Sequence, residues 1–133
     1  MRRTMLAGIM ALATFPLTAQ TATPESFQLR NGQDLADLCA VPDGDAMAEA
    51  ARSFCYGYLR GVYEFHAALK PTPKDRPLFC VPAPGPTRAE AGQRFVAWSK
   101  ANPQFMGEPA VDALVRFAVA NWPCAPATAK KSK

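Results

Sequence analysis

Four cysteines are the residues of this chain best able to do chemistry: Cys39, Cys55, Cys80 and Cys124. A cysteine thiolate can attack a substrate, bind a metal ion or pair into a disulfide. The spacing between these cysteines does not resemble the paired CxxC ligands of a zinc site. The chain has one histidine, His66, which is too few for a conventional metal cluster or a Cys–His dyad. We therefore expect no metal, no cofactor and no catalytic residue among them.

The N-terminal residues indicate the compartment in which these cysteines fold. Residues 1–22 begin with a basic stretch, continue with an apolar run and end in small residues near Ala19 or Ala22. This is the layout of a secretory signal peptide, and the apolar run is too short to span a bilayer as a mature helix. We expect an exported protein with no membrane contact after cleavage, and an uncleaved membrane anchor is the alternative. In an oxidising compartment, an even number of cysteines predicts two disulfides.

The remaining titratable residues do not form a recognisable catalytic set. His66 falls late in a predicted helix, one position past its apolar stripe, which favours a surface or half-buried side chain over a catalytic base. Glu64, Glu108 and Asp112 offer carboxylates, but no spacing pairs them for acid–base work. Glu64 instead fits an i,i+4 ion pair with Arg60. The sequence therefore favours a binding protein over an enzyme.

Length and charge limit the remaining classes. Residues 23–126 suffice for one small domain, and residues 127–133 form a basic tail. The formal net charge of +4 overstates the basicity, because the region from Glu25 to Ala125 holds 10 basic and 11 acidic residues. No basic face is interleaved with aromatic residues, so nucleic acid is not an expected partner.

The spacing of apolar residues predicts an all-α fold, a small bundle of about four helices. Thr23 to Gln28 lack periodicity and are expected to form a polar leader. A short first helix opens at Asn31-Gly32 and ends at Val41-Pro42-Asp43-Gly44. The second helix spans about Ala46 to Leu69, with Asp45 as its N-cap. Lys70 to Pro86 contains six prolines and predicts an extended connector tied down at Cys80.

Two further helices follow the connector. The third has Thr87 as its N-cap and Glu90 as the partner in a capping box, and it stops at Asn102-Pro103. The fourth has Pro109 in its first turn and is closed by Pro123. Each of the last three helices has an apolar stripe that is expected to be buried. The stripes are Met47, Ala51, Phe54, Tyr58, Val62, Phe65 and Leu69; then Ala91, Phe95 and Trp98; then Val111, Leu114, Val115, Ala118 and Trp122.

The disulfide connectivity stays open at this point, since four cysteines allow three pairings. If the third and fourth helices form an antiparallel hairpin, Cys80 lies beside Cys124, which leaves Cys39 with Cys55. The main alternative pairs Cys55 with Cys80 and Cys39 with Cys124.

Two glycines and one loop are candidates for contact surfaces. Gly57 and Gly61 each destabilise a helix by about 1 kcal/mol relative to alanine. Because they are four residues apart, they leave one strip of the helix without side chains, where another helix can approach closely. This helix belongs either to the monomer or to a second copy at a dimer seam bordered by Tyr56 and Tyr63. The loop from Ala101 to Pro109 is stiffened by two prolines. Its apolar tip predicts either a lid folded onto the core or a projecting anchor that binds a partner. The partner-binding candidates are Asn102, Gln104, Phe105, Met106 and Glu108.

Four sequence segments, taken together, resemble those of a known family. In chain order they are Asn31-Gly32 with Leu35 and Cys39, the block from Phe54 to Val62 containing Cys-Tyr-Gly-Tyr, Phe79-Cys80-Val81-Pro82, and Trp122-Pro123-Cys124. This order resembles the Rap/Tai immunity proteins of bacterial type VI secretion systems, over about Asn31 to Cys124. The resemblance implies a small, helical, disulfide-bonded periplasmic protein, often a homodimer. It also implies a partner, a secreted peptidoglycan hydrolase effector of the amidase type, which the protein binds and blocks.

An alternative of another class is a periplasmic chaperone or stress-related protein that binds unfolded clients through exposed apolar surface. Such proteins usually switch by titration, whereas this chain has one histidine and 11 acidic residues. An enzyme is the third reading, and the absence of an assembled nucleophile or metal set disfavours it.

Overall fold

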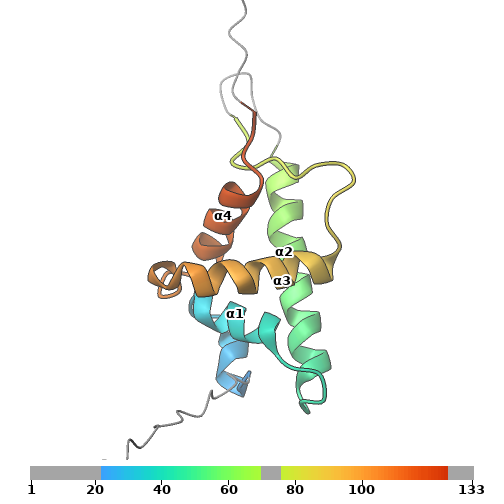
Figure 1. Ribbon diagram of the computed structural model, residues 1–133, viewed down its shortest axis with the longest axis vertical. Coiled ribbons are helices and arrows are strands. Elements are labelled where there is room, and N and C mark those ends of the chain that lie inside the picture. The colour runs from blue at the N-terminus through green and yellow to red at the C-terminus, as the bar shows by residue number, and fades with distance from the viewer. Residues whose placement is uncertain (1–21, 70–75, 126–133) are drawn as a thin grey trace, which may run out of the picture.

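The computed structural model describes residues 22–69 and 76–125, which form an all-α fold (Figure 1). This confirms the predicted fold class, and the described residues contain no strand. The predicted signal peptide, apart from Ala22, lies outside the described residues, and so does the basic tail, residues 127–133. The helices, in chain order, are the 3₁₀ helix η1 (Pro24–Gln28), α1 (Gly32–Ala40), α2 (Ala48–Ala68), α3 (Arg88–Ala101), the 3₁₀ helix η2 (Pro103–Phe105) and α4 (Ala110–Asn121).

Side-chain caps explain where two of these helices begin. The side chain of Asn31 accepts a hydrogen bond from the backbone N–H of Asp34 at the start of α1. Thr87 and Glu90 form the predicted capping box at the start of α3. Asp45 is not the N-cap of α2, which begins only at Ala48. Its carboxylate instead accepts from the N–H of Met47 in the preceding turn.

The segment expected to be an irregular leader is a 3₁₀ helix, η1. Pro24 lies in its first turn, where the fixed φ of proline suits a helix. Ser26 is buried and accepts a hydrogen bond from the N–H of Thr23. Leu29, with a left-handed φ of 52°, ends the helix. Ring packing of Phe27 against α2 holds this short element in place, a contact that periodicity could not reveal.

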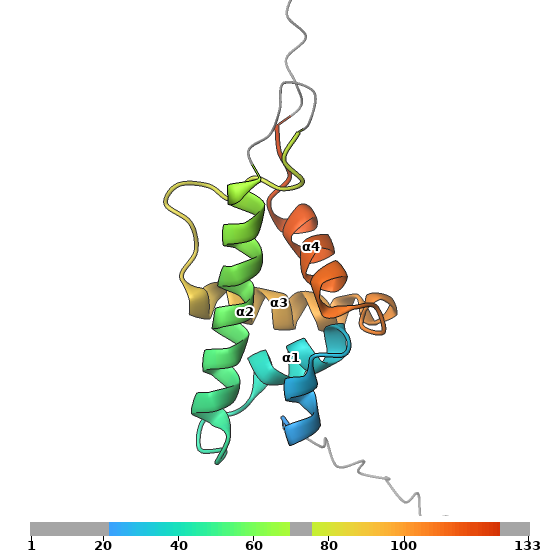
Figure 2. The ribbon, with the colours of Figure 1, turned by 180° about the vertical axis from the view of Figure 1, so that it is seen from behind.

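Helix α1 lies at the centre and packs against α2, α3 and α4 (Figure 2). Its first turn docks on the loop before α4, where Gly32 and Gln33 donate backbone hydrogen bonds to the carbonyls of Glu108 and Met106 at 2.9 and 3.0 Å. A Cβ on Gly32 would lie 2.7 Å from the Cβ of Ala113, so this contact requires glycine. One core cluster joins α1, α3 and α4 through Leu35, Ala36, Phe95, Met106, Ala110, Ala113, Leu114 and Phe117.

A second core cluster lies between α1 and the N-terminal half of α2. It contains Ala22, Leu38, Val41, Ala48, Ala51 and Cys55. The N-terminal part of α2 is therefore covered. Its C-terminal part extends past α1 and α3 and meets the connector and the end of α4 (Figure 2).

This geometry corrects the predicted stripes. On α2 the stripe was expected to be buried over its whole length, but Phe54 and Leu69 are exposed and Phe65 is 67% exposed. On α4, Val111 is exposed while the unpredicted Phe117 is fully buried. A stripe is buried only where another element crosses it, and periodicity alone does not give the crossing points.

The disulfides are Cys39–Cys55 and Cys80–Cys124, with Cα atoms 5.2 and 4.9 Å apart. This confirms the first of the two pairings considered. The expected antiparallel hairpin of α3 and α4 is wrong, however, because the two helices cross (Figure 1). Cys80 reaches Cys124 because the connector passes the end of α4 before it runs out to the start of α3 (Figure 1).

An ion pair stabilises the first turn of α1. The Asp34 carboxylate is almost buried and accepts hydrogen bonds from the Arg30 Nε, Nη2 and backbone N–H at 2.9 to 3.1 Å. The side-chain hydrogen bonds from Arg30 lower the pKa of Asp34. On the same helix, burial instead raises the pKa of Asp37. The charged form of Asp34 therefore stabilises the fold.

We predict that Asp34→Asn lowers the free energy of unfolding at pH 7 by about 1–2 kcal/mol, since hydrogen bonds to a charged group are lost. Because the folded pKa is lowered, this contribution is complete above the unfolded pKa of about 3.9 and disappears as pH falls through the folded pKa. Urea denaturation between pH 7 and pH 2.5 measures it. Asp37→Asn is the matched control and should not destabilise the protein at pH 7. A constant difference between wild type and Asp34→Asn at every pH would contradict this account.

Candidate docking surface

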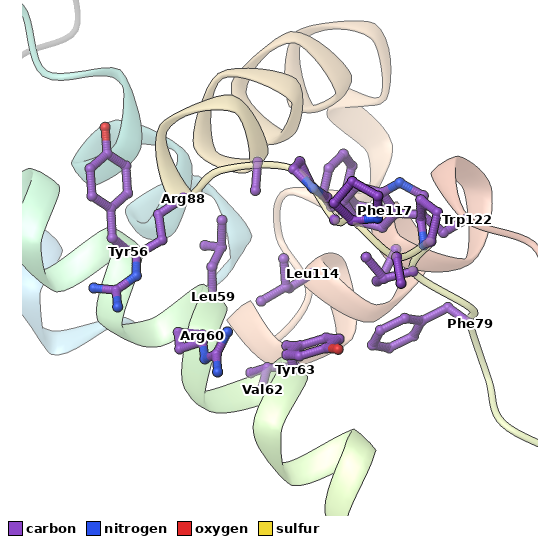
Figure 3. Close-up of a pocket in the computed structure, with 18 residues that line it drawn as sticks. Tyr56, Leu59, Arg60, Val62, Tyr63, Phe79, Arg88, Leu114, Phe117 and Trp122 are labelled. Carbon is purple, nitrogen blue, oxygen red and sulfur yellow. The ribbon is translucent and has the colours of Figure 1, made fainter.

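An apolar groove of about 320 Å³ lies between the C-terminal half of α2, the connector and α4 (Figure 3). We call it the groove, and the connector is the described segment 76–87. Helix α2 contributes Tyr56, Leu59, Arg60, Val62 and Tyr63 to its lining. The buried residues Leu114, Phe117 and Ala118 of α4 lie opposite, with Trp122 beside them.

The connector forms the outer wall of the groove and is fixed at both ends. At one end, Cys80 is bonded to Cys124 and its backbone N–H donates to the carbonyl of Trp122 at 2.8 Å. At the other end, the capping box of Thr87 and Glu90 anchors it to α3. The part of the connector that the structure describes contains no helix, as the prolines predicted.

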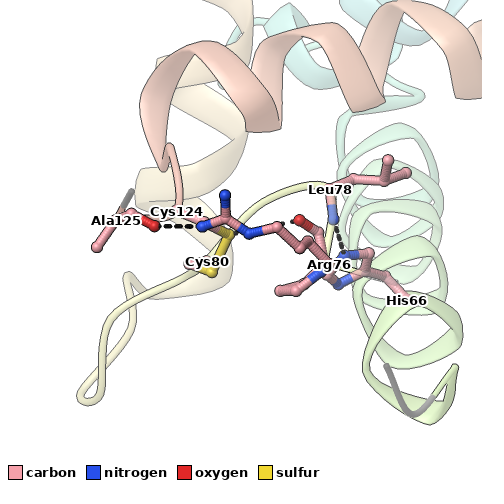
Figure 4. The surroundings of a disulfide bond; sticks show 7 residues. His66, Arg76, Leu78, Cys80, Cys124 and Ala125 are labelled. Carbon is pink, nitrogen blue, oxygen red and sulfur yellow. Dashed lines mark hydrogen bonds between the residues drawn. A yellow bond between two sulfur atoms is a disulfide. The ribbon is translucent and has the colours of Figure 1, made fainter. Parts of the chain in front are cut away.

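His66 anchors the connector to α2. Its ring stacks on Phe79 with centroids 3.8 Å apart, and its Nε2 accepts a hydrogen bond from the Leu78 N–H at 3.1 Å (Figure 4). Arg76 donates to the carbonyl of Ala125 at 2.6 Å beside the disulfide. His66 is half-buried, as expected, and these contacts give it a structural role.

Two arginines lie at one end of the groove. Figure 3 shows Arg60 and Arg88 at the Tyr56 end, away from Phe79 and Trp122. Arg60 pairs with Glu64 and its guanidinium carbon lies 5.5 Å from the centre of the Tyr63 ring. Arg88 is exposed and has no ion pair among the described residues. No acidic residue lines the groove, and because Arg60 is paired with Glu64, the positive charge at this end comes from Arg88.

The two candidate glycines do not mediate a close approach within the monomer. Apart from the adjacent residues and the backbone of α2 itself, no described atom lies within 4 Å of a Cβ placed on Gly57 or Gly61. The close approach occurs at Gly92 of α3, where a Cβ would lie 3.1 Å from the Tyr56 ring. Tyr56 and Tyr63 line the groove. A dimer seam at the two glycines stays a prediction.

The loop between α3 and α4 folds onto the core, so the expectation of a projecting apolar tip is wrong. Met106 is 5% exposed and belongs to the core. Phe105 stacks on Trp98 with centroids 5.8 Å apart and lies under the Arg116 guanidinium. The loop is therefore the lid that was the other interpretation of its sequence.

The polar residues of this loop also have local roles. The Asn102 side chain donates to the carbonyl of Trp98 at 2.8 Å, and Glu108 pairs with Arg116 at 2.6 Å. Gln104 is exposed. Partner binding by this loop stays a prediction, with Gln104 as its most accessible candidate.

Comparison with known proteins gives one match. A family model described as Rap1a immunity proteins matches residues 31–124. The chain belongs to the Rap1a immunity protein family. No curated protein and no solved structure matches it. The matched region contains all four cysteines and every residue that lines the groove.

The described part of this Rap1a family member shows no assembled catalytic or metal centre. Glu64 and Glu108 are engaged in ion pairs, and Asp112 lies exposed in the first turn of α4. Residues 22–69 and 76–125 contain no group of three His, Cys, Asp or Glu side chains placed to hold a metal ion. Within the same ranges, no helix combines the length and hydropathy needed to cross a bilayer.

The groove could not be predicted from the sequence. Its lining comes from α2, from the connector with the first turn of α3, and from α4, and these segments are distant in the chain. The available signal on α2 was the set of Tyr56, Arg60 and Tyr63 beside the apolar stripe, but this does not identify the opposite wall.

Proposed function

We propose that this chain is a periplasmic immunity protein that binds and occludes a type VI secretion effector, a peptidoglycan amidase. In this role it protects the producing cell and its siblings. Membership of the Rap1a immunity protein family is the observation that carries the proposal. An inhibitor of this kind needs a rigid surface that excludes substrate, and it needs no chemistry of its own.

The structure supports this proposal with features of a stable docking body. Two disulfides closing loops of 16 and 44 residues each stabilise a small domain by about 2–4 kcal/mol in the chain-entropy view. Such crosslinks persist in an oxidising compartment, where a secreted wall hydrolase acts. Ala22 packs in the core with Leu38, which favours signal cleavage after Ala19 over cleavage after Ala22.

The proposal predicts rescue that depends on export. If a wall hydrolase is encoded beside this chain, directing it to the periplasm of a host cell should lyse that cell. Co-expression of the full chain should restore growth, because the inhibitor then meets the hydrolase. A matched variant that lacks residues 1–19 should stay in the cytoplasm and give no protection. Purified inhibitor should also block release of peptide fragments from isolated cell wall at a one-to-one ratio.

Two outcomes would count against this proposal. Equal rescue by the variant that lacks residues 1–19 would contradict the proposed periplasmic role. If the exported, folded chain neither restores growth nor inhibits the hydrolase, the proposal that it binds an amidase is wrong. The chaperone alternative draws on the exposed Phe65, Leu69 and Leu78, and it instead predicts that the protein prevents aggregation of a denatured client.

We also propose a homodimer, formed through the outer face of α2. Phe54, Gly57, Gly61 and Phe65 are exposed, and their spacing of three or four residues places them on one face. The two glycines allow a second helix to approach closely. Tyr56 and Tyr63, predicted to border the seam, line the groove, so the proposed seam rests on the glycines and the two phenylalanines.

Gly61→Leu tests the seam. The added side chain has open space in the monomer, so folding should be preserved, while the dimer should weaken at least about tenfold because the helices cannot approach. Sedimentation equilibrium measures the dimer constant. Ala67→Leu, at another exposed position of α2, is the matched control and should dimerise as the wild type does. A monomeric wild type, or unchanged dimerisation of Gly61→Leu, would contradict the seam.

A further inference from the structure

We propose that the groove is the docking site for the effector, and that it receives an apolar segment carrying a carboxylate at one end. This inference rests on the proposed function and names the chemistry of the partner at the site. The candidate residues of the loop and of the dimer seam do not line the groove: Gln104, Gly57 and Gly61 are absent from its lining. It is therefore a surface separate from both earlier candidates.

The walls of the groove favour apolar side chains. Its inner side is made by buried Leu114 and Phe117, and its rim includes the half-exposed Val62 and Tyr63. A volume of about 320 Å³ is within the range in which proteins bind small groups, and it is large enough for a few side chains of an extended segment. Burial of such side chains would remove apolar surface of both partners from water.

The charged residues of the groove indicate which chemical group lies at the end of the bound effector segment. Arg60 and Arg88 lie at the Tyr56 end, and no acidic residue lines the groove. A guanidinium group binds a carboxylate through two parallel hydrogen bonds, and Arg88 has no ion pair among the described residues. The occupant should thus present a carboxylate at this end. The basic residues after Ala125 of this chain have the wrong charge for that position.

The groove is also held in place before binding. The disulfide at Cys80 and the capping box at Thr87 fix the two ends of the outer wall. The inner wall consists of helices. A surface that is already ordered loses little conformational entropy on binding, which favours affinity.

Calorimetric binding to the hydrolase identified by the rescue experiment tests the inference. Arg88→Glu should weaken binding about 10- to 100-fold, since it replaces an attraction with a repulsion. Tyr63→Ala, at a side chain that is 38% exposed, should weaken it about tenfold. Binding by wild type should fall more steeply with added salt than binding by Arg88→Glu. The Glu side chain suits the first turn of α3, so folding should be preserved, and the melting temperature checks this.

Each groove variant has a matched control. Arg94→Glu makes the same charge change at an exposed position of α3 outside the groove. Val119→Ala truncates a side chain that is 41% exposed on α4, also outside the groove. Both controls should bind within about threefold of wild type, as expected for surface positions away from an interface.

The outcomes separate the two proposals. If wild type does not bind the hydrolase, the proposed function fails and the groove inference fails with it. If wild type binds and the folded groove variants bind equally well, the groove inference alone is overturned. A loss of binding confined to Gln104→Arg would overturn it as well and would assign docking to the loop between α3 and α4.

Discussion

The Cys80–Cys124 disulfide holds together the part of the molecule that the hydrophobic core does not reach. The core clusters cover α1, α3, α4 and α2 as far as Val62, whereas the last turns of α2 extend past them and leave Phe65 exposed. The connector beside it has no helical hydrogen bonds of its own. The crosslink, one backbone hydrogen bond to Trp122 and the stack of Phe79 on His66 fix it against α2 and α4.

The second disulfide has a different physical role. Cys55 is fully buried and Cys39 lies in the last turn of α1, so this bond joins α1 to α2 inside the core. In a domain of about 100 residues, the core alone leaves a small margin of stability, and a crosslink at the centre adds to that margin. One bond therefore supports the core, while the other supports the groove. The two together give a small chain a rigid surface.

Much of the fold could be predicted from the sequence because its boundaries are set by local chemistry. The capping box at Thr87 and the stop at Asn102-Pro103 depend on neighbouring residues only, and both are confirmed. Burial was harder to predict, because it depends on where helices cross. Phe65 fits the apolar stripe yet lies beyond the last crossing, and Met106 lies in a loop yet is buried. The disulfide pairing was predicted correctly from a hairpin that does not exist, since the path of the connector brings Cys80 to Cys124.

The candidate site was predicted less well for the same reason. The groove combines residues from α2, the connector, the first turn of α3 and α4, and no local pattern links them. The sequence predicted Arg60 only as the partner of Glu64 and gave no role to Arg88, although both lie at one end of the groove. Membership of the Rap1a family assigns an immunity role to the chain but no residue to its surface.

Every cysteine of this protein lies in a disulfide, and the two disulfides support the core and the groove. Alkylation and non-reducing peptide mapping of the protein taken from the cell envelope test it most directly. The account predicts no alkylated cysteine and two linked peptide pairs, one joining Cys39 to Cys55 and the other joining Cys80 to Cys124. Free thiols in the folded protein, or a bound zinc ion, would contradict it.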